Sequence, residues 1–266
     1  AAAQITPAER TGISELGEAL DFGGGGIGSN AWALGSEATK SGGGMVLGNP
    51  HFPYAGIERL YETRMTVPGQ IDVSGVTMLG IPLVVLGYNK DVAWTHTVST
   101  ASRFTLQELK LKPGDPRTYL VDGAEKAMTA VDVSVPLADG STSTRRFYRT
   151  EFGPLFVHPL LGATWSAARA YALQDVNMDN NRAVATWLAA GKAHDVRELR
   201  DALATLRGIP YVNTIASDRA GEVLYGDLSA VANVEKTLLD QCNSVIGPAL
   251  LAARSIAVLD GSATVG

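Results

Sequence analysis

The chain has 266 residues, a net charge of −5 and 45% hydrophobic against 18% charged residues. This balance suffices for a packed core and excludes a globally disordered chain. The mildly acidic charge and the lack of a Lys/Arg cluster argue against a nucleic-acid partner. No apolar run approaches the roughly 20 residues that a membrane helix needs, so we expect no membrane insertion.

The first 28 residues differ from the rest, because they end in the glycine run GGGGIG. This run contains a formal G-x-G-x-x-G at Gly23, Gly25 and Gly28. A dinucleotide-binding loop follows a strand and opens a helix, whereas here a strand-like segment follows the glycines. The motif is therefore a weak sign of a cofactor, and we expect a flexible, accessible segment.

From Ser29 on, short strand-like runs alternate with turn signals. They predict a large, mostly antiparallel sheet system that begins with a hairpin. The expected strands cover residues 29–35, 44–50, 58–67, 76–89, 92–100, 103–111, 117–123, 128–136 and 144–157. A second hairpin, turning at the DRAG sequence of residues 218–221, is expected after residue 211.

Two helices are expected late in the chain. The first, over residues 180–191, has an apolar face of Val184, Trp187 and Leu188. The second begins at Asp195 with Glu198 three positions later, which is a capping-box pattern. Its apolar face consists of Val196, Leu199, Leu203 and Leu206. Sheet, helices and sheet again indicate an α+β fold. The chain begins mid-segment and ends without a closing element, so we expect a fragment of a longer protein.

Ser29 follows the glycine arm and opens the first strand, which suits a catalytic serine. Such a serine can attack the carbonyl of Gly28 and cleave the chain, leaving Ser29 with a free α-amine. The unperturbed pKa of an α-amine is about 7.7–8.0, so this amine can accept a proton near neutral pH. Nucleophile and base then belong to one residue. On spacing alone, however, a plain loop–strand junction explains this serine better.

The chain contains four separated segments in this order: GSNAWALG, GGGMVLGNPHFPYAGIERLYETRMTVPG, VAWTHTVSTASRFT and RGIPYVNTIASDRAGEVLYGD. Together they resemble the β-subunit of the penicillin acylase family of N-terminal nucleophile hydrolases, most closely acyl-homoserine-lactone and aculeacin-type acylases. The resemblance runs from Gly28 to about Gly261. It implies an αββα sandwich of antiparallel sheets, here partial and truncated at both ends. It also implies that residues 1–28 are the end of the α-subunit and the excised linker, and residues 29–266 the first part of the β-subunit.

The resemblance implies roles for single residues. Ser29 matches the N-terminal nucleophile, and Gly28–Ser29 matches the self-cleaved bond. His51 matches a histidine that organises the surroundings of the nucleophile, and the backbone N–H of Val98 matches a donor to the oxyanion. Without the resemblance, His51 is better explained as a satisfied loop or core histidine, and Val98 as strand core. The second oxyanion donor of the family is an asparagine downstream of this chain, and Asn213 does not match it.

Four apolar residues match positions that line the fatty-acyl pocket of the lactone acylases: Phe52, Ile81, Trp187 and Tyr211. Each of them is also compatible with plain hydrophobic core, Ile81 above all. Tyr211 stands where a tryptophan often stands in that subfamily. The preferred length of the acyl chain is therefore open.

The resemblance also bears on metals and on the compartment. Penicillin G acylases bind calcium through aspartates just after the oxyanion segment, but STASRFTLQEL has no aspartate. We therefore expect no calcium by that route, no other metal and no cofactor. Related acylases often pair a cysteine near Cys242 with a downstream one, although a buried free thiol is equally compatible. A pairing would indicate an oxidising compartment, and the family implies a periplasmic or secreted protein.

The resemblance implies an amide hydrolase that removes a fatty-acyl group from an acyl amide, such as an N-acyl-homoserine lactone. Its expected partner is the α-subunit from the same precursor. Deacylation of a penicillin or a cyclic lipopeptide by the same chemistry is an alternative. An alternative of another class is a non-catalytic β-rich scaffold in which Ser29 never becomes a terminus. The fragment alone is expected to be inactive, because it lacks the α-subunit and the second oxyanion donor.

Overall fold

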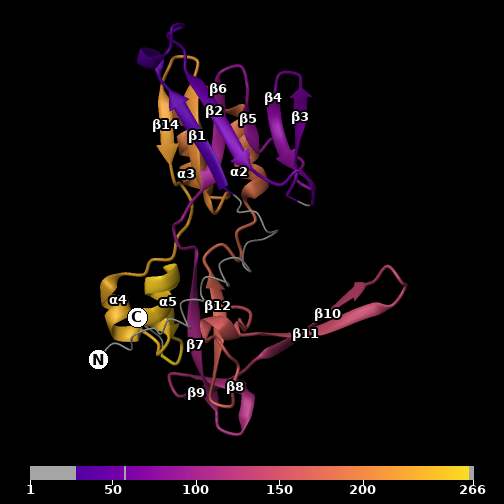
Figure 1. The fold of residues 1–266 in the computed structure, drawn as a ribbon, viewed down its shortest axis with the longest axis vertical. Coiled ribbons are helices and arrows are strands. Elements are labelled where there is room, and N and C mark those ends of the chain that lie inside the picture. Colours follow the sequence, from indigo (N-terminus) through magenta and orange to yellow (C-terminus); the bar gives the residue numbers. More distant parts are fainter. Residues whose placement is uncertain (1–27, 57, 264–266) are drawn as a thin grey trace. The chain divides into compact units, whose positions relative to one another are not determined.

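The structure, a computed structural model, describes residues 28–56 and 58–263 (Figure 1). These residues form two compact units. The β1 unit comprises residues 28–101 and 179–230, and the β7 unit comprises residues 102–178 and 231–263. The formal G-x-G-x-x-G motif and the expected flexible segment begin in residues 1–27, which lie outside the described residues.

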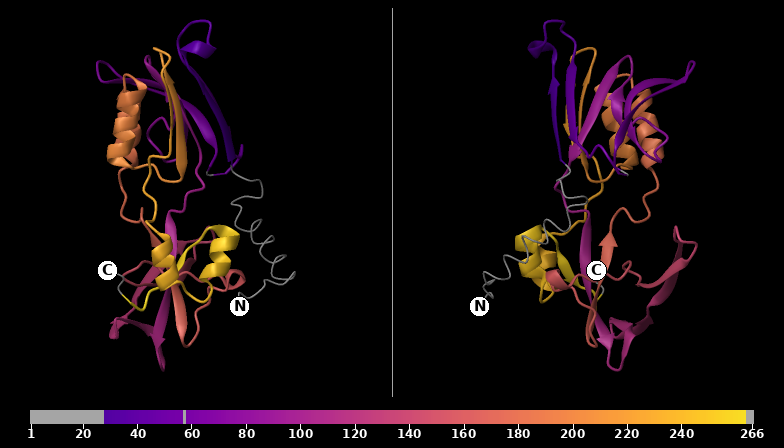
Figure 2. Two further views of the ribbon diagram at one scale, coloured as in Figure 1. Left: turned by 90° about the vertical axis from the view of Figure 1, so that its left-hand side faces the viewer. Right: turned by 45° about the vertical axis from the view of Figure 1, so that its right-hand side comes forward.

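A six-stranded antiparallel sheet forms the centre of the β1 unit, in the order β14-β13-β6-β5-β4-β3. Its strands are β3 (Leu60–Val67), β4 (Ile71–Met78), β5 (Leu86–Tyr88), β6 (Val92–Val98), β13 (Val212–Asp218) and β14 (Val223–Gly226). The hairpin of β1 (Gly28–Leu34) and β2 (Met45–His51), joined through the short helix η1 (Ser36–Ala38), packs on one face. Helices α2 (Ala183–Lys192) and α3 (Val196–Leu206) cover the other face (Figure 2).

Successive side chains of β6 point to opposite faces of the sheet, one toward helices α2 and α3 and the other toward the β1–β2 hairpin. Val92 and Trp94 are 2% exposed and belong to the core shared with the helices. Thr95 points to the opposite face, where Gly48 of β2 lies against it. A Cβ at Gly48 would come within 2.5 Å of Thr95 Oγ1, so only glycine lets the hairpin approach the sheet this closely.

The two predicted helices are present, with differences in detail. Asp195 caps α3 by accepting from the N–H groups of Arg197 and Glu198 at 2.9 and 2.7 Å. Glu198 does not complete a capping box, since its carboxylate accepts from the N–H of His194 instead. The apolar face predicted for α2 is wrong in part, because Val184 is 53% exposed. The helix instead buries Thr186, Ala190 and Gly191.

The β7 unit contains a sheet in the order β12-β7-β8-β9, antiparallel throughout, and β15 pairs with β7 in parallel. Its strands are β7 (Phe104–Lys112), β8 (Asp115–Val121), β9 (Ala124–Ala127), β12 (Arg169–Asp175) and β15 (Val258–Asp260). The short helix η2 (Pro159–Leu161) and helices α4 (Lys236–Cys242) and α5 (Gly247–Arg254) complete the unit. Neither α4 nor α5 was expected from the sequence. Cys242 ends α4 as a free thiol among the described residues.

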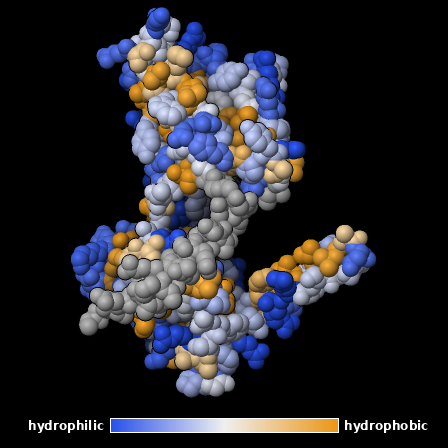
Figure 3. All heavy atoms as spheres, in the orientation of Figure 1, coloured by the Kyte–Doolittle hydropathy of each residue, from blue (hydrophilic) through white to orange (hydrophobic). Residues whose placement is uncertain are grey.

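The hairpin of β10 (Thr129–Pro136) and β11 (Thr142–Arg149) is a separate two-stranded sheet of the β7 unit, and we call it the arm. All eight residues of β10 are exposed, including Val131, Val133 and Val135. Hydrophobic side chains run along the arm in Figure 3. On its other face, Arg146 and Asp132 form an ion pair at 2.7 Å.

The expectation of an α+β fold with mostly antiparallel sheets is confirmed. The predicted single strand over residues 76–89 is wrong, because β4 ends at Met78 and β5 begins at Leu86. Gly80, at φ 87°, turns the chain between them, a conformation that other residues rarely adopt. Within the described residues, no helix combines the length and apolar character needed to span a bilayer.

Candidate functional site

Ser29 is the second residue of β1 and stands opposite Pro50 of β2. Its hydroxyl donates a hydrogen bond of 2.5 Å to the carbonyl oxygen of Gly28. The hydroxyl therefore lies beside the carbonyl group of the bond that the sequence predicts to be cleaved. The β1–β2 ladder holds this geometry, since it pairs every residue from Gly28 to Leu34.

His51 lies directly opposite Gly28 in the hairpin. A Cβ at Gly28 would lie 3.3 Å from His51 Nδ1, so glycine gives the imidazole room at this position. Asn49 Nδ2 lies 3.3 Å from His51 Nε2. Because an amide nitrogen only donates, His51 Nε2 is the acceptor in this contact. Asn49 was not predicted, although its place two residues before His51 on one strand face was a readable signal.

Two contacts align the hairpin with the sheet beneath it. Ser217 Oγ of β13 lies 3.3 Å from the carbonyl oxygen of Leu34, at the end of β1. Gly48 and Thr95 meet midway along β2 and β6. The start of β1 and the end of β2 therefore point toward the end of β6. By these registers, Ser29, His51 and Val98 belong to the same end of the β1 unit. The strands that carry them, β1, β2 and β6, are labelled in Figure 1.

The hydrogen-bond pattern of β6 directs the N–H of Val98 away from β13. Val98 is paired with Val212, and the N–H of the next residue, Ser99, donates to the carbonyl oxygen of Tyr211 at 2.9 Å. Antiparallel ladders alternate between bonded and non-bonded pairs, so Val98 and Val212 form a non-bonded pair. On the other side, β5 pairs with β6 only at Ala93 and Trp94. The N–H of Val98 is thus directed away from the ladder, as an oxyanion donor requires.

The four residues predicted for the acyl pocket all belong to the β1 unit. Phe52 follows β2, Ile81 follows β4, and Tyr211 precedes β13 with φ 67°. Trp187 of α2 packs against the core on the helix side of the sheet, and its buried Nε1–H has no acceptor among the described residues. That these four residues line one pocket stays a prediction.

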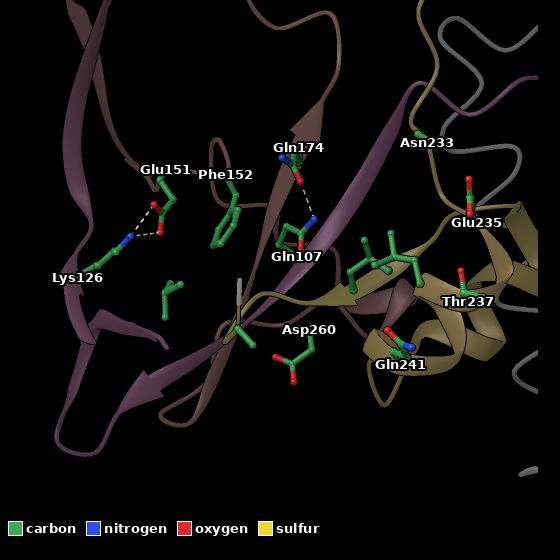
Figure 4. Close-up of a pocket in the computed structure, with 14 residues that line it drawn as sticks. Gln107, Lys126, Glu151, Phe152, Gln174, Asn233, Glu235, Thr237, Gln241 and Asp260 are labelled. Carbon is green, nitrogen blue, oxygen red and sulfur yellow. Dashed lines mark hydrogen bonds and ion pairs between the residues drawn. The ribbon is translucent and has the colours of Figure 1, made fainter. Parts of the chain in front are cut away.

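Cavities among the described residues lie elsewhere, and two of them bear on the site. A pocket of about 620 Å³ in the β7 unit contains the Lys126–Glu151 ion pair and a 2.6 Å hydrogen bond from Gln107 to Gln174 (Figure 4). A pocket of about 270 Å³ beside β2 has Pro50, the ladder partner of Ser29, in its wall. None of the predicted site residues lines either one. The described part of the chain contains no group of three or more His, Cys, Asp or Glu placed to hold a metal.

The burial of His96, two residues before Val98, predicts that the stability of the folded chain depends on pH. It is 6% exposed, its Nδ1 lies 3.2 Å from Thr214 Oγ1, and burial lowers its pKa to about 4. Below about pH 6.5 the histidine is protonated in the unfolded chain but stays neutral in the folded chain. The free energy of unfolding therefore falls by about 3 kcal/mol as the pH drops toward 4. The measurement is the free energy of urea unfolding against pH.

The matched variants for this prediction are His96→Leu and His194→Gln. His96→Leu should flatten the pH dependence between 4 and 6.5, whatever its stability at pH 7. His194 is exposed, so His194→Gln should keep most of the dependence. An unchanged slope in His96→Leu would refute the assignment to His96.

The chain is similar to known proteins along most of its length. The family model described as penicillin amidase matches residues 1–264. The chain is 46% identical to aculeacin-A acylase of Actinoplanes utahensis over 98% of its own length and 33% of that protein. It is 41% identical to acyl-homoserine lactone acylase PvdQ of Pseudomonas fluorescens (strain Pf0-1), over 88% of this chain and 30% of that protein.

The chain thus spans about a third of the length of these curated relatives. Among solved structures, thermostable penicillin G acylase from Alcaligenes faecalis matches with a TM-score of 0.71 at 19% identity. The match covers 87% of this chain and 38% of that chain, and at this identity the likeness concerns the fold alone. By its fold and by the sequence match along its length, the chain belongs to the penicillin amidase family.

Proposed function

We propose that the protein containing this chain is an amide hydrolase with an N-terminal serine nucleophile. Cleavage of the Gly28–Ser29 bond makes Ser29 the first residue of a β-subunit, and residues 29–266 are the N-terminal part of that subunit. Residues 1–28 are then the end of the α-subunit and the linker. The proposal is supported by the strand registers, in which the start of β1, with Ser29, and the end of β6, with Val98, belong to the same end of the β1 unit.

In the proposed mechanism, the neutral α-amine of Ser29 takes the proton of its own hydroxyl as Oγ attacks the amide carbonyl. The negative oxygen of the tetrahedral intermediate accepts a hydrogen bond from the N–H of Val98. The C–N bond breaks, and the amine leaves with the proton held by the α-amine. Water then attacks the acyl-enzyme ester, gives up a proton by the same route and releases the carboxylic acid. His51 shapes the surroundings of Ser29 and makes no covalent bond.

The proposed substrate is an amide with a medium or long fatty-acyl chain, such as an N-acyl-homoserine lactone. Two relatives support this class, since they are named aculeacin-A acylase and acyl-homoserine lactone acylase. Phe52, Ile81, Trp187 and Tyr211 would line an apolar pocket that accepts an alkyl chain and rejects a charged one. The proposed protein acts in the periplasm or outside the cell, paired with the α-subunit of its own precursor.

The test begins with the full-length gene, because the chain covers only part of its relatives. Intact mass and N-terminal sequencing of the β-subunit should give Ser-Asn-Ala-Trp as the new terminus. An uncleaved but well-folded protein contradicts the mechanism and favours the non-catalytic scaffold.

Acyl specificity gives a second expected result. We expect kcat/KM for a decanoyl amide to exceed that for a phenylacetyl amide by at least about tenfold, because each buried methylene contributes about 0.8 kcal/mol. Octanoyl and dodecanoyl amides with the same leaving amine define the preferred length. A preference for phenylacetyl amides would instead indicate a penicillin acylase. Hydrolysis restricted to a cyclic lipopeptide would indicate the other alternative.

A further inference from the structure

The peptide group between Val98 and Ser99 is held at both of its polar atoms. Its N–H donates to the carbonyl oxygen of Tyr211 at 2.9 Å, and its oxygen accepts from Asn213 Nδ2 at 3.2 Å. A peptide group is planar, so two bonds on opposite sides fix its orientation. The neighbouring peptide group, which carries the N–H of Val98, is joined to it through a single Cα. The direction of that N–H therefore depends on these two bonds.

Asn213 is itself held in one orientation. Its Nδ2 also donates to Thr97 Oγ1 at 3.1 Å, and Tyr225 donates its hydroxyl hydrogen to Asn213 Oδ1 at 3.3 Å. With the oxygen of the amide occupied by a donor, its nitrogen is directed at the Val98 carbonyl. Asn213 thus bridges β13 and β6 at the last residue of β6.

A second link holds the residue after Val98. Ser99 is 9% exposed, and its Oγ donates to Asp227 Oδ2 at 2.5 Å. The N–H of Ala101 donates to the same Oγ at 3.2 Å, and Ser229 donates to Asp227 Oδ1. A hydrogen bond to a carboxylate is about twice as strong as one between neutral groups. The segment after β6 is therefore tied to the segment after β14.

We propose that Asn213 is a positioning residue for the Val98 N–H, and that Asp227 reinforces it through Ser99. The inference rests on the proposed function, because it assigns these residues to the oxyanion donor of that reaction. Neither side chain touches the substrate. Asn213 fixes the Val98 carbonyl, and Asp227 fixes the Ser99 hydroxyl, so that the N–H is aimed before the negative charge develops. Preorganised donors of this kind stabilise the transition state without reorganising during the reaction.

The test uses the full-length, processed enzyme and the variant Asn213→Asp. This change keeps the size and the acceptor for Tyr225 but removes the donor to the Val98 carbonyl. We expect kcat to fall by about 10–100-fold at an unchanged KM and an unchanged pH profile, because only transition-state stabilisation is lost. Thr97→Val is the matched control. It removes the other acceptor of Asn213 Nδ2 but leaves the bond from Tyr225 that orients the amide, so it should keep kcat within about twofold.

An alkylboronic acid gives a readout that a purely structural role would not move. It forms a tetrahedral adduct with Ser29 Oγ, and one of its oxygens takes the place of the oxyanion. Its inhibition constant should rise in Asn213→Asp by the same factor as kcat falls, while inhibition by the product fatty acid stays constant. Ser99→Ala should show the same pattern at about 3–10-fold, and Ser99→Thr should restore it. If Asn213→Asp is not cleaved at Gly28–Ser29, the same measurements on Ser99→Ala test the proposal.

The outcomes separate the two proposals. A wild-type protein that is neither cleaved at Gly28–Ser29 nor active overturns the proposed function and this inference with it. A cleaved, active wild type with unchanged boronic acid binding in Asn213→Asp and Ser99→Ala overturns this inference alone. Equal weakening of boronic acid and fatty acid would also overturn it, because the loss would then be one of general pocket structure.

Discussion

Replacing Ser29 by alanine in the full-length precursor should leave the Gly28–Ser29 bond intact and reduce amidase activity by about 10⁴-fold or more. The effect is this large because one residue supplies the nucleophile and, after cleavage, also the base. The hydroxyl lost in this variant is the one that lies 2.5 Å from the carbonyl oxygen of Gly28. The measurements are the intact mass of the products and the hydrolysis of a decanoyl amide.

Two variants control this result. Ser29→Cys should still be cleaved, because a thiol is also a nucleophile. Asn30→Ala changes the exposed neighbour on β1 and should be cleaved and remain active. Normal processing and hydrolysis in Ser29→Ala would mean that Ser29 is not the nucleophile. The proposed mechanism would then be wrong for this chain.

The second large effect concerns a single hydrogen atom, the backbone hydrogen of Val98. An amide-to-ester substitution, in which an α-hydroxy acid with the valine side chain replaces Val98, removes the N–H and keeps the side chain. We expect kcat to fall by about 10²–10³-fold with little change in KM, which is the usual loss when one oxyanion donor is removed. Steady-state kinetics on the processed enzyme measure it.

The matched control is the same substitution at Thr97. The N–H of Thr97 faces β13 in the ladder, since the bonded pairs alternate from Ser99 and Tyr211. Its removal costs a sheet hydrogen bond, about 1 kcal/mol of stability, and should leave kcat within about threefold. Equal kinetic losses at Val98 and Thr97 would mean that the Val98 effect reflects damage to β6 rather than to a donor.

Local sequence patterns were sufficient for most of the fold. The alternating strands and the N-cap of α3 at Asp195 involve neighbours in the chain, so pattern and turn chemistry could predict them. Helix α4 was missed because none of its residues is buried, which leaves no apolar stripe to read. The run over residues 76–89 misled because apolar character alone does not reveal the turn at Gly80.

The site, like the fold, was predictable from the sequence only in part. Ser29, His51 and Val98 were predicted from a family resemblance, and the structure places them at one end of the β1 unit. Their alignment depends on contacts such as Gly48 with Thr95, 47 positions apart, which no local pattern contains. Asn213 was set aside as the wrong asparagine for the oxyanion, and nothing in its strand showed that it bonds to the carbonyl of Val98. Links of this kind arise only from tertiary packing.

The arm has a practical consequence for work on this protein. Its strands form a separate two-stranded sheet, and its tip closes through a hydrogen bond from the N–H of Leu137 to the carbonyl oxygen of Ser141. An exposed hairpin tip tolerates insertions well, because no core side chain has to move. Residues 138–140 are therefore the place to introduce an affinity tag or a fluorophore, which could report on maturation without altering either terminus.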